Sequence, residues 1–476
     1  MGLFLGIKRV MGVHTLDSEV NIAEDLTAHG DVDLWIGQQK EYRDVPSHVS
    51  NELGRRTSAL PAVLTHLPYE SLPVLQLLRT ALPQITESFQ CISPHDLFSF
   101  HETTHTSMEC FRLSAPSSNF LTHLRACAGQ AMLDGKPSIQ HWERSDIFLP
   151  FDALGTWDYI LQIITAKKAW IGALQWIAGR PQAIQEQYMT HITSLLHQVP
   201  WKGYIKGLGS SLTITDMAEF LSQEWLSDSH IHCMLTLTKH RHLDVLSGAD
   251  PRITITEIIM PDFPSHILSS PLLATTPIAP DYFAKAPKSV ISLGRKIANA
   301  AAGIRIAAVA FSPPGHWACL FINTQAGTIS WGDSVGRAVP SGFETRLRVW
   351  LELFIPKMQF SPMQDLLCAH QTDSYSCGIV AVNTLKHHIF GDELWTPSRR
   401  EILRIQEFID IMEFSESWKG RVSIFVYHDK PVSFTHKSTT RTAIYNTIGR
   451  HCSYAGTCPF HALHASDSAA GHAKYH

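Results

Sequence analysis

One cysteine, Cys377, lies where a thiol could act as a nucleophile. It ends the polar stretch QTDSYSC, and Gly378 and the apolar run IVAV follow it, which indicates a loop entering a helix. Helix N-termini carry partial positive charge and free N–H groups, so they favour a thiolate and can hold an oxyanion. Gly378 would leave room for a substrate backbone, and the Gln371 amide would add a second oxyanion donor. A small buried cysteine is the plainer alternative.

A histidine and an aspartate flank a predicted β-hairpin upstream of this cysteine. HWACLFIN and GTISWGD read as strands joined by the turn-like segment NTQAG. A register that sets Asn323 opposite Ala326 also sets His316 opposite Asp333, and opposed residues share a face of the hairpin. The carboxylate would then orient the imidazole and stabilise its charged form. An ordinary polar pair at a sheet end is the alternative, and a one-residue slip would separate the two side chains.

The elements around these residues predict an α+β domain over residues 210–430. RIAAVAFSP reads as a third strand, rich in β-branched and aromatic residues. Helical spacing is found in LTITDMAEFLSQEWLSDSHIHCMLTLTKH and in SGFETRLRVWLELFIPK. The segment after Cys377 reads as a helix that stops near Gly391. Because helical and strand-like segments both occur in this half, we expect an α+β architecture.

The sequence of residues 1–205 predicts a mostly helical domain and contains no motif that indicates its role. The clearest helical spacing lies between residues 155 and 200. The Gly-, Pro- and Ser-containing stretch VPWKGYIKGLGSSL is the expected boundary to the second domain. Residues 431–476 are polar and rich in histidine, so we expect a disordered tail there.

Composition narrows the class of protein. The net charge is -4 and charged residues make up 17% of the chain, so no basic face for nucleic acid is indicated. Nine cysteines form no disulfide framework, which favours a reducing compartment. The N-terminus lacks the order of a secretory signal, and no apolar run is long enough to span a membrane. We therefore expect an intracellular protein, in the nucleus or the cytoplasm, that needs no cofactor; its oligomeric state is not indicated.

Two clusters of zinc-type ligands occur in the sequence. The gaps between their ligands match no familiar zinc-finger spacing. Solvated or core histidines are the better interpretation of the cluster that begins at residue 230, and a zinc site in the tail cluster is a minor alternative. The clusters are HIHC at 230–233 with His240 and His242, and Cys452, Cys458, His461 and His464 in the tail.

The order of the motifs resembles a known family. HW at 316–317, WGDS at 331–334 and QTDSYSCG at 371–378 follow one another as in the Ulp1/SENP family of cysteine proteases, which process ubiquitin-like modifiers. EWLSDSHIHCML at 224–235 resembles the Trp-Leu-x-Asp entry of the family's domain. The resemblance covers residues 210–430 and implies a papain-like/adenain-type cysteine protease domain, although papain itself has cysteine before histidine.

The resemblance implies a role for each matching residue. Cys377 corresponds to the nucleophile, His316 to the general base and acid, Asp333 to the residue that orients the histidine, and Gln371 to the oxyanion-hole residue. Ser376 departs from the aspartate that many relatives carry. The residues that match substrate contacts are Trp225 and Trp317, which wall a tunnel over a Gly-Gly tail in the family, and Asp228, which can touch the modifier surface.

The implied function is cleavage after the C-terminal Gly-Gly of a ubiquitin-like modifier, SUMO-like by default, through a thioester. The partners would be that modifier and its conjugates. Two other functions stay open. One is an acyltransferase on the same fold, which the two tryptophans disfavour because a bulky acyl donor needs room. The other is a non-catalytic module that binds a ubiquitin-like protein, which an intact set of catalytic residues disfavours.

Overall fold

The computed structural model describes residues 32–58, 69, 71–86, 93–247, 256–274, 282–300, 303–313 and 315–426. The chain divides into two units, Met1–Gly420 and Arg421–His476. The predicted tail, with its cysteines and histidines at 452–464, lies outside the described residues. Within the described part of the chain, no helix combines the length and the apolar character needed to cross a lipid bilayer.

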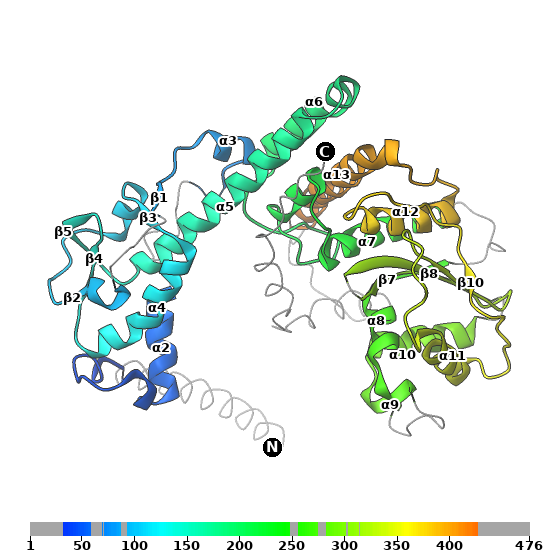
Figure 1. Cartoon of the computed structure of the whole chain (residues 1–476), viewed down its shortest axis with the longest axis horizontal. Coiled ribbons are helices and arrows are strands. Elements are labelled where there is room, and N and C mark those ends of the chain that lie inside the picture. The colour runs from blue at the N-terminus through cyan, green and yellow to red at the C-terminus, as the bar shows by residue number, and fades with distance from the viewer. Residues whose placement is uncertain are drawn as a thin grey trace, which may run out of the picture. The chain divides into compact units, whose positions relative to one another are not determined.

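A mixed five-stranded sheet forms the centre of the C-terminal half (Figure 1). The three middle strands form an antiparallel meander, and each edge strand runs parallel to its neighbour. Three of these strands, β7, β8 and β9, are the ones that the sequence predicts. In spatial order the strands are β10 (Gln364–Asp365), β9 (Thr328–Gly332), β8 (His316–Asn323), β7 (Arg305–Ser312) and β6 (Thr256–Ile259).

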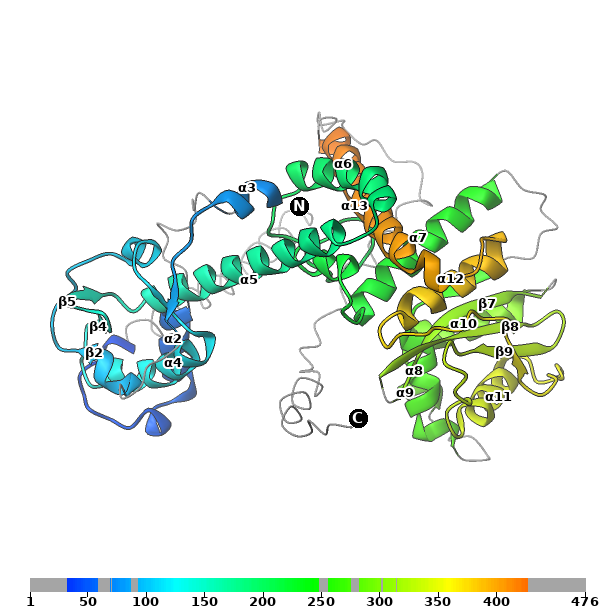
Figure 2. The ribbon, with the colours of Figure 1, turned by 45° about the horizontal axis from the view of Figure 1, so that its top comes forward.

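Helices cover both faces of this sheet, so the half is a three-layer α+β domain, as expected (Figures 1 and 2). Alternate residues of each strand face opposite layers: Val309 belongs to one core and Ala308 to the other. One layer contains α7 (Asp228–Ser247), α12 (Cys377–Phe390) and α13 (Arg400–Val426). The other contains α8 (Asp262–Ser269), α9 (Tyr282–Lys285), α10 (Lys288–Asn299) and α11 (Phe343–Phe354).

The N-terminal half contains helices and two small sheets (Figure 1). The sheets were not expected, since three of their strands are only two residues long and too short for a periodic signal. The helices are α2 (Ser47–Ser58), α3 (Val74–Arg79), α4 (Ser118–Leu133), α5 (Ala153–Ala178) and α6 (Gln182–Gln198). The strands are β1 (Ile85–Thr86), β2 (Phe98–Ser99), β3 (Ala115–Pro116), β4 (Ser138–His141) and β5 (Arg144–Leu149).

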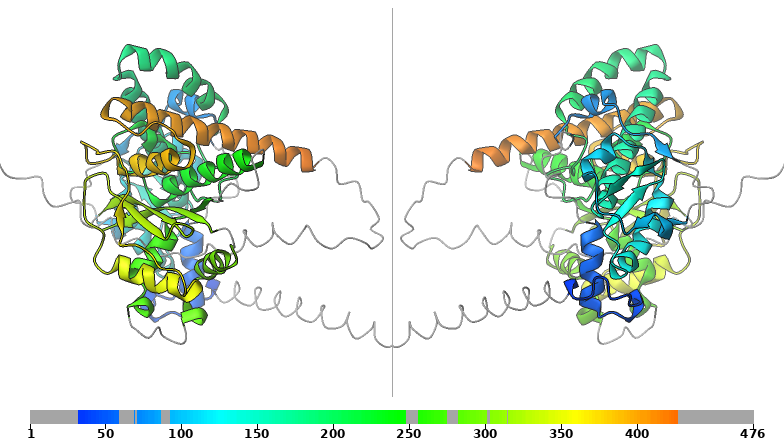
Figure 3. Two further views of the ribbon diagram at one scale, coloured as in Figure 1. Left: turned by 90° about the vertical axis from the view of Figure 1, so that its right-hand side faces the viewer. Right: turned by 90° about the vertical axis from the view of Figure 1, so that its left-hand side faces the viewer.

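Helix α5 contributes to two hydrophobic cores. Its first half, including Trp157, packs into the core of the N-terminal half. Its second half, including Trp170 and Ile177, packs with α6 into the core that also contains α7, α12 and α13. The views at right angles in Figure 3 show the same helices from either side. Helix α5 therefore contributes side chains to two separate cores, one in each half of the chain.

The stretch expected to be a domain boundary is packed rather than free. Trp201, Ile205, Leu208 and Leu212 are buried in the same core as α7 and α12. The backbone N–H of Ile205 donates to Leu212, so the stretch folds back on itself. A 3-10 helix, η5 (Asp216–Leu221), then leads toward α7. Gly207 allows close packing in this stretch: its φ is +79°, and a Cβ there would lie 2.7 Å from the Trp418 ring.

Candidate active site

Cys377 is the first residue of α12, as predicted. Asp373 shapes the loop before it, because its carboxylate accepts the backbone N–H groups of Tyr375 and Ser376 at 2.9 and 2.7 Å. It also accepts the Ser376 hydroxyl at 2.8 Å. The carboxylate thus fixes the backbone of the two residues that lead into the helix. The cysteine is 2% exposed, and it stands where the field of the helix favours negative charge on sulfur.

His316 and Asp333 are in direct contact. His316 Nε2 lies 3.1 Å from Asp333 Oδ1, and both side chains are nearly inaccessible to solvent. Because Nε2 bonds to Asp333, Nδ1 is the ring nitrogen left for Cys377, a neighbour that raises the pKa of the imidazole. The structure therefore brings together the three side chains that the sequence predicts as nucleophile, base and orienting carboxylate.

Electrostatics in this cluster favour a charged imidazole. Burial alone disfavours the cation, but the hydrogen bonds and charges of Asp333 and Cys377 outweigh it and raise the pKa of His316 to about 9. Burial would raise the pKa of Asp333, yet the hydrogen bonds from His316 and from the Val335 N–H, with the His316 charge, lower it below its ordinary value. At neutral pH the pair is thus an imidazolium beside a carboxylate, which is the state that supports a thiolate at Cys377.

The hairpin register differs from the prediction by two residues. Asn323 lies opposite Thr328, not Ala326, so the turn contains four residues and Asp333 lies one residue beyond β9. His316 and Asp333 are diagonal neighbours rather than directly opposed. An even shift keeps both side chains on one face, and diagonal neighbours are within reach of long side chains. The contact was therefore predicted from a wrong register.

Gln371 links two loops: the loop after β9, which contains Asp333 and Ser334, and the loop 372–376 that leads to Cys377, here called the cysteine loop. Its Oε1 accepts the Ser334 hydroxyl at 2.6 Å, its Nε2 donates to Asp373 O at 2.8 Å, and its backbone N–H donates to Ser334 O at 2.8 Å. These bonds fix the amide with its nitrogen toward the cysteine loop. One of the two Nε2 protons remains for an oxyanion. Neither Ser334 nor Asp373 was singled out from the sequence, although both lie inside the matched motifs WGDS and QTDSYSCG.

The two predicted tryptophans are placed differently. Trp225 is 44% exposed, and its ring edge lies 3.1 Å from the position of a Cβ on Gly315, the residue before His316. Trp317 is only 2% exposed, and its Nε1 donates to Leu226 O at 3.0 Å. Trp225 is thus accessible to a ligand, whereas Trp317 supports the chain segment that carries it. Asp228 is exposed at the start of α7.

Gly378 serves packing and not substrate access, contrary to expectation. A Cβ at this position would lie 2.8 Å from Ile231 Cδ1 and 3.4 Å from Trp317 Cδ1. The space beside Gly378 is filled by the α7 side of the core. A glycine is needed because α12 and α7 approach each other closely there.

The histidine cluster at 230–233 is structural, as expected. His230 is buried, its Nδ1 lies 2.8 Å from Ser227 Oγ, and its Nε2 lies 3.0 Å from Asp216 O. Burial lowers the pKa of His230 to about 4, so the imidazole is neutral. Among the residues that the structure describes, no group of three or more histidines, cysteines or carboxylates is arranged to hold a metal ion.

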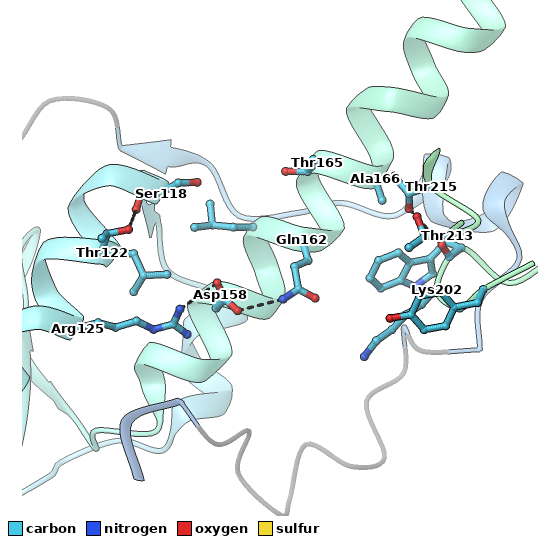
Figure 4. A pocket seen from close by; sticks show the side chains of 15 residues that line it. Ser118, Thr122, Arg125, Asp158, Gln162, Thr165, Ala166, Lys202, Thr213 and Thr215 are labelled. Atoms are coloured by element: carbon cyan, nitrogen blue, oxygen red, sulfur yellow. Dashed lines mark hydrogen bonds and ion pairs between the residues drawn. The ribbon is translucent and has the colours of Figure 1, made fainter. Parts of the chain in front are cut away.

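A cavity of about 550 Å³ lies in the N-terminal half, away from Cys377 (Figure 4). It is lined by α4, α5 and the stretch 201–215. Arg125 pairs with Asp158 at 3.2 Å on its wall, and Gln162 donates to the same carboxylate at 3.0 Å. None of the predicted catalytic or substrate-binding residues lines it.

No protein-family model matches the chain, and no curated protein matches it. Solved structures do. The C-terminal Ulp1 protease domain in complex with Smt3, the yeast orthologue of SUMO, is 18% identical, with 43% of this chain and 84% of that chain covered and a TM-score of 0.30. The Ulp1-like SUMO protease catalytic domain of Chaetomium thermophilum is 14% identical, with 48% and 89% covered and a TM-score of 0.33. The Xanthomonas campestris effector XopD bound to ubiquitin is 15% identical, with 39% and 92% covered and a TM-score of 0.27. The first two are Ulp1-type proteases, the family that the sequence motifs resemble.

Proposed function

We propose that this chain is a cysteine peptidase that cleaves after the C-terminal glycine of a ubiquitin-like modifier, with SUMO-like proteins as the first candidates. One observation carries the proposal: His316 contacts Asp333 at 3.1 Å, and Cys377, which begins a helix, interacts electrostatically with the same imidazole. A cysteine, a histidine and an orienting carboxylate in contact are the parts of a thiol nucleophile with its own acid and base. The activity belongs to residues 210–430.

The first half of the reaction forms a thioester. The Cys377 thiolate attacks the carbonyl carbon of the modifier's last glycine, and the carbonyl oxygen becomes an oxyanion. The Cys377 N–H and the Gln371 amide stabilise this charge. His316, protonated at neutral pH and oriented by Asp333, gives its proton to the leaving amine as the carbon–nitrogen bond breaks. The amine is a lysine side chain in a conjugate or an α-amine in a precursor.

The second half releases the modifier. His316, now neutral, takes a proton from a water molecule, whose oxygen attacks the thioester carbon. The carbon–sulfur bond breaks, the modifier leaves with a free carboxylate, and Cys377 returns as a thiolate beside the imidazolium. His316 and water carry all the protons that move, so Cys377, His316 and one water molecule account for the whole hydrolysis.

Substrate selection is assigned to Trp225. Its exposed indole lies against Gly315, next to His316, so it is placed to contact a substrate chain near the candidate catalytic histidine. A tail of two glycines can approach the indole closely because it has no side chains to clash with the ring. Trp317 holds the segment from beneath through Leu226. Asp228, exposed at the start of α7, is placed to contact the folded body of the modifier.

Covalent labelling tests the proposal. Ubiquitin, SUMO and other ubiquitin-like proteins with a C-terminal electrophile are offered to the wild type, to Cys377→Ala and to Cys127→Ala, a half-buried cysteine of α4 that serves as control. We expect at least one probe, SUMO first, to label the wild type and Cys127→Ala and not Cys377→Ala. Labelling of Cys377→Ala would remove Cys377 as the nucleophile.

The same proteins separate the two other functions. An acyltransferase would acetylate a partner in the presence of acetyl-coenzyme A, which mass spectrometry of that partner detects. A binding module would retain a modifier on an affinity column yet form no adduct with any probe. Either result would overturn the peptidase assignment.

A further inference from the structure

Arg404 is a fully buried cation next to the candidate active site. Its guanidinium, on α13, donates from Nε to Phe220 O at 3.0 Å and from Nη2 to Glu219 O at 2.5 Å and Glu224 O at 3.0 Å. All three acceptors belong to the segment that ends at Trp225. A single side chain therefore pins the backbone that presents the exposed indole, with the forked geometry that only arginine supplies.

The same guanidinium faces the cysteine loop. Arg404 Cζ lies 5.6 Å from the centre of the Tyr375 ring, two residues before Cys377, and Arg400, one turn earlier on α13, lies at the same distance. Arg400 also lies 3.5 Å from Asp373 Oδ2, the carboxylate that shapes the loop. Helix α13 thus contacts two segments of the site. Arg404 binds the backbone that leads to Trp225, and Arg404 and Arg400 together contact the cysteine loop.

Arg404 has no direct counter-ion within the described part of the chain. Its hydrogen-bond acceptors are carbonyl oxygens, and its Nη1 is buried without a hydrogen-bond partner. Burial lowers the pKa of Arg404 to about 10, so the charge persists at neutral pH. A buried cation in this condition costs free energy unless an anion lies nearby.

The charged groups around Arg404 only partly compensate its positive charge. They are Glu219 from η5, His230 from α7, Arg400 from α13 itself, and Asp373, Tyr375 and Cys377 from the loop and start of α12. Burial raises the pKa of Glu219 to about 7, so that carboxyl is only partly ionised at neutral pH. Asp373 is already engaged with Arg400 and with two backbone N–H groups. His230 is neutral, and the Cys377 sulfur is the remaining group near the guanidinium that can carry a negative charge.

We propose that Arg404 is a positioning residue of the proposed peptidase: it joins the Trp225 segment to the cysteine loop, and its buried charge stabilises the Cys377 thiolate. The inference rests on the proposed function for the role of Trp225, but the effect on Cys377 does not require any substrate. Its two parts, the carbonyl contacts and the charge, can therefore be measured separately.

The test compares Arg404→Gln, which removes the charge, with Arg404→Lys, which keeps the charge and loses the fork. Arg241→Met is the control. Arg241 also lies over an aromatic ring, that of Phe390, but unlike Arg404 it has a carboxylate partner, Asp392, beyond the far end of α12 and about 20 Å from Cys377 by helix rise. The readouts are the pH profile of Cys377 alkylation by iodoacetamide, followed on its peptide by mass spectrometry, and kcat and KM on the modifier that labels best.

We expect Arg404→Gln to move the alkylation profile to higher pH, with a rate on the order of tenfold lower at neutral pH. Arg404→Lys should keep the wild-type profile while KM rises on the order of tenfold. Arg241→Met should change neither. A wild-type profile in folded Arg404→Gln overturns the electrostatic part, and a wild-type KM in Arg404→Lys overturns the positioning part.

Folding is checked by circular dichroism. If Arg404→Gln does not fold, the test rests on Arg404→Lys. A shifted alkylation profile in that variant contradicts the electrostatic part of the proposal, and an unchanged KM contradicts the positioning part. If no modifier is a substrate, the proposed peptidase function fails. The alkylation profiles then still support or overturn the effect of Arg404 on Cys377.

Discussion

His316 donates a 3.1 Å hydrogen bond to Asp333 although the two residues are not opposite each other in the hairpin. The aspartate lies one residue past the end of β9, and its backbone turns there so that Oδ1 also accepts the Val335 N–H at 2.9 Å. The carboxylate is therefore held by its own loop before it meets the imidazole. This prearrangement makes Asp333 an orienting group whose loss should be felt in the reaction and not only in folding.

Asp333→Asn should lower the rate at which Cys377 is labelled by on the order of 10²–10⁴-fold, because an amide cannot stabilise the imidazolium or enforce the same ring tautomer. The rate of labelling by the best modifier probe measures the effect. Asp365→Asn is the matched control, since Asp365 is exposed at the end of β10. A labelling rate within twofold of the wild type in Asp333→Asn would contradict the role of the carboxylate.

The alkaline side of the pH–rate profile should follow His316. Its pKa is raised to about 9, so the protonated form that serves the leaving amine is lost as the pH rises through about 9. In Asp333→Asn the raising hydrogen bond and charge are gone, so the alkaline limb should move to lower pH. An NMR titration of the His316 ring, independent of turnover, checks the same shift.

Folding stability should depend on pH through the same histidine. Since the folded pKa of His316 lies above the ordinary value of about 6.5, its protonation stabilises the folded chain fully below that value. This contribution is lost as the pH rises from about 6.5 through about 9. Denaturant unfolding of the wild type and of His316→Gln at pH 6 and pH 9.5 measures it, and the two proteins should differ less at the higher pH.

Gly378→Ala should destabilise the domain by about 1–2 kcal/mol, because the new Cβ would lie 2.8 Å from Ile231 Cδ1 in a filled core. Ile231→Val removes that carbon, so the double variant should lose less than the sum of the single variants. Gly172→Ala in α5 is the control: no atom lies within 4 Å of its Cβ, and better helix propensity should stabilise by up to about 1 kcal/mol. Additive losses in the double variant would speak against the contact.

Ser334→Ala should weaken catalysis through Gln371. The hydroxyl fixes the amide by donating to its Oε1 at 2.6 Å, so its removal lets the amide turn and leaves a buried acceptor unpaired. We expect kcat to fall about tenfold in Ser334→Ala and on the order of 10²–10³-fold in Gln371→Ala. The double variant should match Gln371→Ala alone, because both changes act on one donor. A further drop in the double variant would assign Ser334 a separate role.

The parts of the site that could be predicted from sequence are those with strong local signals. The strand at 316–323 shows a dense β-branched and aromatic composition, and α12 shows a polar loop before an apolar run and Gly391 after it, in the structure at φ +77°. The register was missed because the turn is built by side chains. Asn323 Oδ1 accepts the N–H groups of Gln325 and Ala326, and Gly327 takes φ +65°, so four residues form the turn instead of two.

The contacts from distant residues could not be predicted in the same way. Arg400 and Arg404 look like ordinary charges on an amphipathic helix, and only the packing of α13 against η5 and the cysteine loop buries Arg404. The same holds for Trp317. Its place in a motif did not reveal that Leu226 O would hold its indole inward.

Because α5 belongs to two cores, it limits where the chain can be truncated without exposing a core. A fragment beginning at residue 210 would lack α5 and α6, and the side of α13 around Phe408 that packs edge-on against Trp170 would be laid bare to water. Such a fragment would expose a broad apolar surface and tend to aggregate. Helices α5 and α6 of the N-terminal half thus support the fold of the C-terminal domain, and truncated chains made to test the proposed function should keep both helices.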